Sequence, residues 1–235
     1  MNDSLTLPGS NSGKELIREV EGVRYERWPI KTHVVMPDDE ISLVVDHYAK
    51  PHLKEGDVLF MSERVVAITQ GRSYKIDDIE ARPLAVKLSK YVHKTPAGIG
   101  LGSPWTMELA IREVGTFRIL LAAAVAAVTK PLGIRGMFYR VAGREAAAID
   151  GPCDYTLPPY NTCATLGPKD PNGVARTLAE QFGVEIVIID ANDLGVDVLG
   201  RSKNAPSAEV AAEIFKDNPL GQSSEQTPLC IVRRA

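Results

Sequence analysis

Val184-Glu-Ile-Val-Ile-Ile-Asp-Ala-Asn-Asp-Leu-Gly195 begins as an unbroken apolar run and turns polar at Asp190. A run of this kind is typical of a strand buried on both faces of a sheet. We therefore predict a strand that ends in a polar turn starting at Asp190. In α/β folds, polar groups at the ends of buried strands line the clefts where ligands bind, because the strand holds them still. The stretch thus favours an α/β fold with a site at Asp190.

A second acid stands in a similar setting. Asp150 ends Ala146-Ala-Ala-Ile-Asp and is followed by Gly151-Pro152. Two carboxylates at two strand ends suit a metal site, because hard divalent cations take oxygen ligands. The alternative for each acid taken singly is a cap on a turn or on the next helix, which is a common role of Asp.

The composition is that of a globular protein with no net positive charge. The chain has 235 residues, 44% of them hydrophobic, which suffices for one large domain or two small ones. A formal net charge of −3 gives no global attraction for nucleic acid. Three cysteines without CxxC spacing favour a reducing, cytoplasmic setting. The longest apolar run, residues 119–128, is about half of what a bilayer requires, and the N-terminus lacks a signal-peptide pattern, so we expect no membrane association.

The rest of the chain alternates predicted strands and helices. We expect strands at residues 23–30, 58–61 and 229–232, and helices at 41–50, 77–91, 174–182 and 205–215. Ser103-Pro104 is typical of a helix N-terminus, whereas the Ala-rich residues 117–129 fit a helix or a strand. Residues 137–142 and 146–149 are predicted to form a hairpin.

Two stretches have the chemistry to hold a phosphate. Ser62 and Arg64 follow the predicted strand at 58–61 and offer a hydroxyl and a guanidinium fork, with a capped turn and a solvated Arg64 as the alternative. Gly221-Gln-Ser-Ser is small and polar, so its amides could cradle a phosphate, although a surface loop has the same composition. The glycines of residues 98–102 are spaced GxGxG and not GxGxxG, and no clear strand precedes them, so they do not predict a dinucleotide fold.

The long loop at residues 151–173 is rich in Pro, Gly and Asn. Loops of this length in compact domains are usually functional. Cys153 and Cys163 lie in it, but no histidine is near them in the sequence, which favours unreactive thiols over nucleophiles.

Five stretches in this order resemble the coenzyme F420-0:L-glutamate ligase family, the γ-glutamyl ligases of deazaflavin biosynthesis. They are Gly56-Asp57-Val58-Leu59 through Gly71-Arg72, Ile149-Asp150, Asp170-Pro171-Asn172-Gly173, Ile188-Ile189-Asp190-Ala191-Asn192, and Gly221-Gln222 with the strand after Pro228. The resemblance runs from Trp28 to Arg233.

The resemblance implies an α/β fold of mixed α+β sheets that forms an intertwined homodimer. It also implies GTP and two divalent cations, Mg²⁺ or Mn²⁺, with GTP making an acyl phosphate that the amine of L-glutamate attacks to form an amide. Metals and cations neutralise charge on a transferring phosphoryl group. Carried over, the metal ligands are Asp150, Asp190, Ala191 through its carbonyl, and Gln222. The nucleotide-binding positions are Pro29, Ile30, Lys31, Thr32, Ser62, Glu63, Arg64, Cys153, Gly221, Ser223 and Ser224.

The chain also departs from the family pattern. Ile68 stands where the family has a basic residue, and Cys153 where it has an Asn. The segment between Asn192 and Gly221 is shorter than in typical ligases, whereas residues 118–136 and 151–169 look longer. These departures favour two alternatives: a ligase acting on a different acceptor, and a non-catalytic nucleotide- or cofactor-binding protein on the same fold. A thiol-dependent enzyme using Cys153 or Cys163 is a third hypothesis.

For the domain organisation, we expect residues 1–14 to form a disordered arm. Residues 15–235 are expected to form one catalytic domain, divisible into lobes 15–145 and 146–235. The partners implied by the resemblance are a small-molecule acceptor and L-glutamate.

Overall fold

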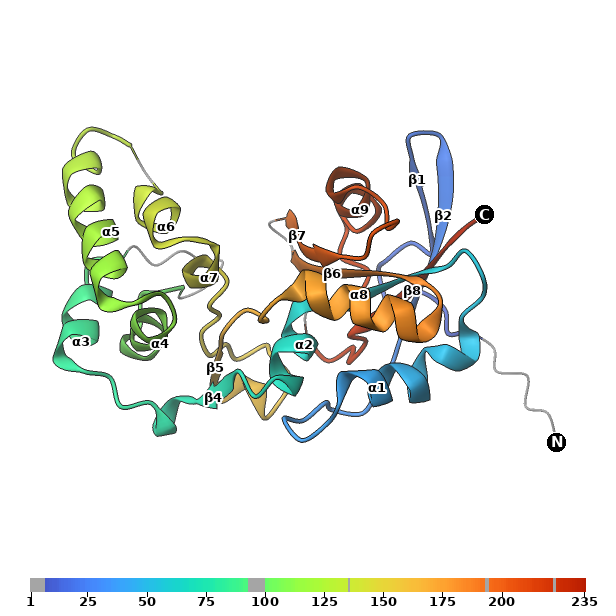
Figure 1. The fold of residues 1–235 in the computed structure, drawn as a ribbon, viewed down its shortest axis with the longest axis horizontal. Coiled ribbons are helices and arrows are strands. Elements are labelled where there is room, and N and C mark those ends of the chain that lie inside the picture. Colours follow the sequence, from blue (N-terminus) through green and yellow to red (C-terminus); the bar gives the residue numbers. More distant parts are fainter. Residues whose placement is uncertain (1–6, 93–99, 135, 193–194, 222) are drawn as a thin grey trace. The chain divides into compact units, whose positions relative to one another are not determined.

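The computed structural model describes residues 7–92, 100–134, 136–192, 195–221 and 223–235. The chain divides into two compact units. Unit 1 combines the two ends of the chain, Met1–Gly71 and Pro168–Ala235, and unit 2 is the continuous segment Arg72–Gly167. Figure 1 shows the order of the elements along the chain.

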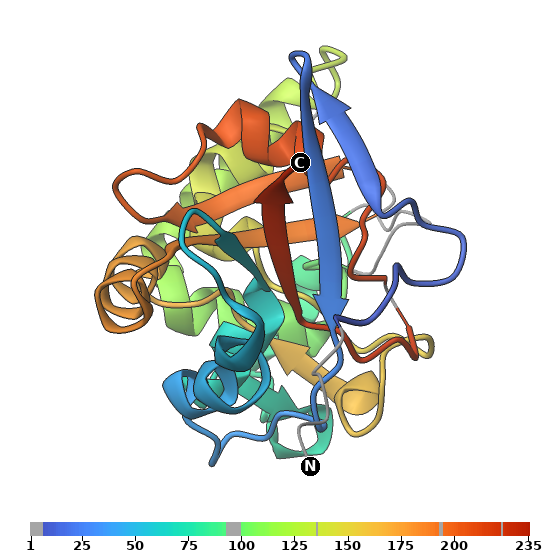
Figure 2. The ribbon, with the colours of Figure 1, turned by 90° about the vertical axis from the view of Figure 1, so that its right-hand side faces the viewer.

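Unit 1 is built on a six-stranded mixed sheet in the order β1-β2-β8-β3-β6-β7. Among the described strands of this sheet, β3 and β6 are parallel, and every other neighbouring pair is antiparallel. Figure 2 shows β8 beside the long strand β2. The strands are β1 (Ile17–Val20), β2 (Val23–Ile30), β3 (Val58–Ser62), β6 (Glu185–Asn192), β7 (Gly195–Arg201) and β8 (Leu229–Arg234).

Helices cover both faces of this sheet. On one face, Phe215 at the end of α9 stacks on Phe60 of β3, with ring centroids 4.2 Å apart. Because side chains alternate along a strand, the flanking Leu59 and Met61 point to the other face, and both are fully buried. Figure 1 shows α9 on one side of the sheet and α1, α2 and α8 on the other. These helices are α1 (Ile41–Tyr48), α2 (Glu63–Thr69), α8 (Pro171–Phe182) and α9 (Ala208–Ile214).

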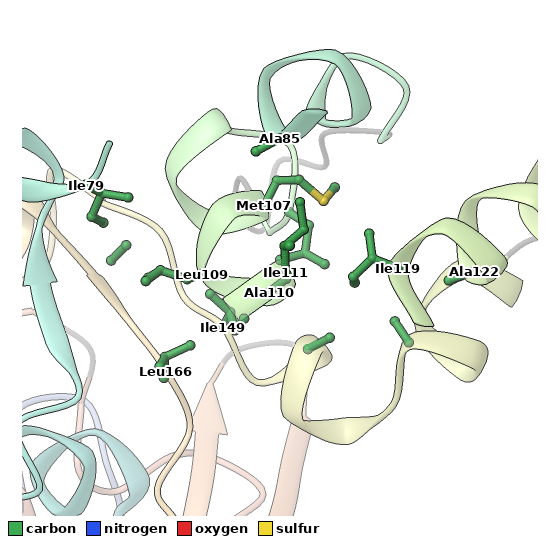
Figure 3. Packing of buried hydrophobic residues seen from close by; sticks show 14 residues of the cluster. Ile79, Ala85, Met107, Leu109, Ala110, Ile111, Ile119, Ala122, Ile149 and Leu166 are labelled. Carbon is green, nitrogen blue, oxygen red and sulfur yellow. The ribbon is translucent and has the colours of Figure 1, made fainter. Parts of the chain in front are cut away.

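Unit 2 is mainly helical and has a core of its own. Figure 3 shows this core, in which Met107 and Ile111 of α4 lie among Ile119, Ile149 and Leu166. The predicted N-terminus of α4 is confirmed, since the Ser103 side chain accepts a hydrogen bond from the Thr106 amide and Pro104 is the first helical residue. The elements are α3 (Pro83–Ser89), α4 (Pro104–Val114), α5 (Thr116–Thr129), α6 (Met137–Ala142), α7 (Arg144–Ala147) and a two-stranded sheet of β4 (Ser73–Lys75) and β5 (Cys163–Thr165). Short 3-10 turns span Lys50–His52, Ile76–Asp78 and Tyr160–Thr162.

The predicted hairpin at residues 137–149 is wrong, because this segment forms the two short helices α6 and α7. Gly136 and Gly143 bracket α6 with φ angles of 77° and 97°. Their conformations separate the helices, since glycine enters this region without strain. Ala142 and Ala146 are fully buried, and such small side chains let the helices pack closely on the core. Tertiary packing thus overrides the strand preference of the aromatic and β-branched residues.

Two further expectations are corrected. The predicted helix at 77–91 is confined to Pro83–Ser89, because Pro83 occupies its first position and the preceding Arg82 is extended. The predicted turn at Asp190 is not a turn, since β6 continues through Asp190 to Asn192, where it pairs with β7. Within the described part of the chain, no helix combines the length and apolar character needed to span a membrane.

Candidate ligand site at the strand ends of unit 1

The carboxyl ends of β2, β3 and β6 lie at one edge of the unit 1 sheet. The strand pairings align Ile30, Leu229, Met61 and Ile188 in a single row across β2, β8, β3 and β6. The residues just beyond this row on β2, β3 and β6, together with the loop that precedes Leu229, form what we call the strand-end edge. Ligands in open sheets bind where strand ends converge in this way.

The segment Pro29–Thr32 enters this edge from β2. Pro29, Ile30 and Thr32 are buried, whereas Lys31 is exposed. The Thr32 amide donates to the Gln226 carbonyl at 3.1 Å, and Gln226 Nε2 donates to the Thr32 carbonyl at 2.7 Å. These two bonds fix the end of β2 against the loop before β8, at a residue just after the expected nucleotide segment Gly221–Ser224.

The chain beyond Thr32 is also held in place. His33 Nε2 lies 2.8 Å from Asp39 Oδ2, and His33 Nδ1 lies 3.0 Å from the Tyr48 hydroxyl. Hydrogen bonds from the Met36 amide and from His33 lower the pKa of the Asp39 carboxyl. The loop that follows Thr32 is therefore anchored on α1.

Ser62 and Arg64 stand at the end of β3. Ser62 pairs with Ile189, the residue before Asp190, and its amide donates to the Pro228 carbonyl at 2.8 Å. Ser62 occupies the N-cap position of α2, but among the described residues its side chain makes no capping bond. The capped-turn alternative for Ser62 is therefore not the arrangement observed. Glu63 is buried and Arg64 half-buried.

Asp190 and its neighbours form the acidic part of the strand-end edge. Asn192 Nδ2 lies 3.3 Å from both oxygens of Asp190, as expected for side chains two residues apart on one face of a strand. Asp197 of β7 is the register partner of Asp190 and is exposed. Since Asp190 lies inside a strand, it caps no helix. The side chains of Asp190 and Asn192 thus place a carboxylate and an amide group side by side at the end of β6.

The loop before β8 contributes a backbone amide. The Ser223 amide donates to Glu225 Oε2 at 2.8 Å, and its hydroxyl lies 3.3 Å from the same oxygen. Gly221 has a φ of 77°, and a side chain there would overlap Glu225. The amide and hydroxyl of Ser223 are thus directed at an anionic oxygen, the chemical type that a phosphate presents. Gln222 lies outside the described residues.

Asp150 and Cys153 belong to unit 2. Asp150 exchanges two backbone hydrogen bonds of 2.9 Å with Thr165, whose hydroxyl lies 2.8 Å from that of Ser73. Asp150 is exposed and Cys153 half-buried. The bridge between Asp150 and Thr165 is an isolated one beside β5. The prediction that Asp150 ends a strand is wrong, because the residues before it form helix α7.

The other cysteines suit inert roles. Cys163 is buried with its Sγ 3.5 Å from the Pro159 carbonyl. Burial raises the pKa of the Cys230 thiol. Both behave as small apolar side chains.

The donor set named from the sequence fits a hard divalent cation in its chemistry, because two carboxylates, an amide and a backbone carbonyl supply only oxygen. Across the residues described, no group of three or more His, Cys, Asp or Glu side chains is arranged to hold a metal ion. The predicted ligand set includes the Ala191 carbonyl and the Gln222 side chain, which are not among these four residue types. The predicted set and the absence of such a group in the described residues are therefore compatible.

Sequence reasoning missed four residues at this edge: Asn192, Asp197, Glu225 and Gln226. Alternation along the strand could have joined Asn192 to Asp190. Asp197 could be found only by recognising β7, which the sequence left unassigned. No sequence pattern pointed to Glu225 or Gln226 apart from their position just after the Gly221 loop.

Comparison with known proteins places the chain in a sequence family. The family model described as F420-0:Gamma-glutamyl ligase matches residues 29–212. The matched segment includes the end of β2 from Pro29, all of β3 and β6, and Asp150, and it ends before the loop at Gly221. No curated protein sequence matches the chain.

Proposed function

The chain belongs to the F420-0:gamma-glutamyl ligase family, and from that premise we propose that it is a GTP- and metal-dependent ligase that forms an amide on a small-molecule acceptor. The observation that supports this most is the extent of the family match, which covers the ends of β2, β3 and β6. Family membership implies ligase chemistry. The nucleotide, the metal and the acceptor belong to the proposal.

In this proposal the strand-end edge binds the nucleotide. Pro29–Thr32 and the junction of β3 and α2 at Ser62–Arg64 flank the phosphates, and the Gly221–Ser224 loop supplies amides. Arg64 is the residue best suited to a charged phosphate, because a guanidinium donates two parallel hydrogen bonds. The Ser223 amide donates to Glu225, so a phosphate that used this amide would displace the carboxylate.

Asp190, Ala191, Asp150 and Gln222 are the proposed metal ligands, with Asn192 orienting Asp190. A bound Mg²⁺ or Mn²⁺ would supply neutralisation of phosphate charge. The remaining steps concern the substrates. The γ-phosphoryl group passes from GTP to an acceptor carboxylate, leaving GDP. The amine of L-glutamate then attacks the acyl phosphate, forming the amide and releasing phosphate and a proton.

The second candidate function is a non-catalytic nucleotide- or cofactor-binding protein. One observation favours it: Ile68, which replaces a basic residue of the family pattern, is buried in α2, so this position offers no cation. A ligase with a different acceptor explains the same replacement. A homodimer and a cytoplasmic location remain part of the proposal, the latter consistent with three free cysteines.

Thermal unfolding with Mn²⁺ and GTP, together and singly, tests the proposal, with ATP as the alternative nucleotide. A ligand at about 100 times its Kd stabilises the folded state by about 2.7 kcal/mol. We expect a rise in Tm that requires metal and nucleotide together and disappears in Asp150→Ala and Asp190→Ala. Asp77→Ala, an exposed acid of unit 2, is the matched control and should keep the full shift.

Phosphate release separates the two candidate functions. A ligase releases phosphate when L-glutamate and a suitable acceptor are added, whereas a binding protein shows the Tm shift alone. If no combination of metal and nucleotide changes the Tm of the wild-type protein, both candidate functions are refuted.

A further inference from the structure

The chain before β1 turns towards the loop that precedes β8. The Lys14 amide donates to the Asn11 carbonyl at 3.0 Å, which closes a turn in which Gly13 has a φ of 74°. Glycine adopts this left-handed conformation without strain. We call residues 11–14 the N-terminal turn. It brings the side chain of Asn11 to residues that lie 208 and 216 positions further along the chain.

Asn11 holds the base of the loop before β8. Its Nδ2 donates to the Pro219 carbonyl and to the Thr227 hydroxyl oxygen, both at 2.8 Å. The Thr227 hydroxyl donates in turn to the Leu220 carbonyl at 2.7 Å. Both hydrogens of the Asn11 amide therefore have acceptors, and the two ends of the loop are tied to one side chain. We call residues 219–221 and 223–227 the phosphate loop, after its role in the proposed function.

The N-terminal turn is itself anchored on unit 1. Lys14 Nζ donates to the Asp217 carbonyl at 2.6 Å, and Arg27 Nη2 donates to the Glu15 carbonyl at 2.5 Å. Arg27 is fully buried on β2 and pairs with the carboxylate of Asp217. Because these bonds fix the turn without using the phosphate loop, Asn11 restrains the loop from a fixed point.

The tip of the phosphate loop bonds within the loop. The Ser223 amide donates to Glu225 Oε2 at 2.8 Å. Pro219 and Thr227 at the base are buried, whereas Ser223 at the tip is exposed. Asn11 thus fixes the base of the loop and leaves the tip open to a ligand.

A fixed base matters because the tip is small and polar. Residues such as Gly221, Ser223 and Ser224 offer little apolar surface whose burial could order a loop. A ligand binds a mobile loop with an affinity reduced by the fraction of molecules in the binding conformation. A contact that holds the loop in one conformation before binding therefore raises the affinity without touching the ligand.

Both partners of this contact lie outside the family match, which covers residues 29–212. The N-terminal turn precedes the matched segment, and the phosphate loop follows it. The contact is therefore a feature of this chain that the family match does not imply.

We propose that Asn11 is a positioning residue for nucleotide binding, whose side-chain amide holds the phosphate loop so that the Ser223 amide meets a phosphate oxygen. The inference rests on the proposed function, because it concerns the same site. It adds a residue that neither the resemblance nor the family match assigns.

Calorimetric titration of the full chain with GTP in saturating Mn²⁺ tests the proposal. Asn11→Ala should bind GTP roughly tenfold more weakly than wild type, as expected for the loss of one or two hydrogen bonds. Ser10→Ala, at an exposed neighbouring position, is the matched control and should bind like wild type. Guanosine lacks phosphates, so its affinity should be the same in Asn11→Ala and wild type. Unchanged GTP affinity in Asn11→Ala, or an equal loss for guanosine, would overturn the proposal.

Hydrogen exchange of the nucleotide-free protein tests the contact without any ligand. The phosphate loop should exchange roughly tenfold faster in Asn11→Ala than in wild type, while β6 is unchanged. Thr227→Val removes the hydroxyl that Asn11 binds and should also loosen the loop. Because both residues act on one contact, the double variant should show less than the combined effect of the single variants.

The two measurements separate the positioning role from the proposed function. Unchanged exchange of the phosphate loop in both Asn11→Ala and Thr227→Val refutes the positioning role alone. A wild type that does not bind GTP in Mn²⁺ refutes the proposed function, and the positioning role falls with it even if Asn11→Ala loosens the loop.

Discussion

At the scale of single residues, the most constrained charge in unit 1 is that of Arg27. Its side chain is fully buried on β2 and forms a two-pronged ion pair with Asp217. It also donates to the Ile214 carbonyl at 2.8 Å and the Glu15 carbonyl at 2.5 Å. A buried guanidinium depends on such partners, because an uncompensated buried charge is strongly destabilising. The pair links β2 to the segment after α9.

Asp217→Asn should show how this pair depends on pH. Burial alone would raise the pKa of Asp217, but the hydrogen bond and charge of Arg27 outweigh it and leave the pKa below its usual value. The stabilisation is therefore complete above pH about 4 and is lost as pH falls through the lower folded pKa. We expect Asp217→Asn to lower the free energy of unfolding at pH 7 by about 1–3 kcal/mol.

Urea unfolding of wild type and Asp217→Asn at pH 7, 5, 4 and 3 checks this prediction. The difference between the two proteins should shrink from pH 4 downward. The exposed acid variant Asp78→Asn should match wild type within about 0.5 kcal/mol throughout. A difference between wild type and Asp217→Asn that stays constant down to pH 3 would refute the assignment.

Single residues with local roles were the most predictable from sequence. The Ser103 cap and the Gly183 end of α8, with a φ of 70°, follow from rules that act within one turn. The ion pair of Arg27 and Asp217 could not be predicted, since its partners are 190 positions apart and meet only through the sheet.

At the scale of elements, the contact between α8 and β7 is unusually close. A Cβ added to Gly200 would lie 2.4 Å from the Pro171 carbonyl carbon and 2.8 Å from the Asn172 nitrogen. Both are backbone atoms and cannot rotate away. The Arg201 amide also donates to Asn172 Oδ1 at 3.1 Å. The start of α8 is therefore fixed directly on β7, the strand that carries Asp197 opposite Asp190.

Gly200→Ala should push the start of α8 away from β7. We expect a loss of about 1–3 kcal/mol in the free energy of unfolding, the usual effect of overpacking. Hydrogen exchange should rise at the α8 N-terminus. Gly9→Ala, whose added Cβ meets nothing within 4 Å, is the control and should change little. Equal urea midpoints for the two variants would contradict the prediction, because they would show that α8 can shift without loss of stability.

Elements were predictable where hydrophobic pattern and turn residues agreed, as in β2, β3 and β8. They were not where packing decides. Residues 137–149 read as strands but form helices on the unit 2 core, and β7 went unrecognised because its half-buried residues alternate weakly. Because β7 was not predicted, Asp190 was expected to lie in a turn. The candidate site was thus predictable in its strands and not in its acidic neighbours.

At the scale of the whole molecule, unit 2 is an insertion into unit 1. Its two ends are held together, because Leu166 donates to the Arg72 carbonyl at 3.0 Å and Arg72 Nε donates to the Gly167 carbonyl at 2.6 Å. Segments whose ends meet can be inserted into a host fold without disturbing it. Composition could bound the chain to one or two domains, but the joining of its two ends into one sheet depends on long-range pairing between β2 and β8.

Residues 72–167 should therefore fold when expressed alone. The segment keeps a complete apolar core and both strands of the β4–β5 sheet. We expect helical circular dichroism and one cooperative thermal transition. Met107→Ala, at a fully buried core position, should destabilise the fragment by about 2–5 kcal/mol, whereas the exposed Tyr91→Ala should not. If the fragment melts without cooperativity while the full chain unfolds sharply, the core of unit 2 depends on the rest of the chain and the insertion is not autonomous.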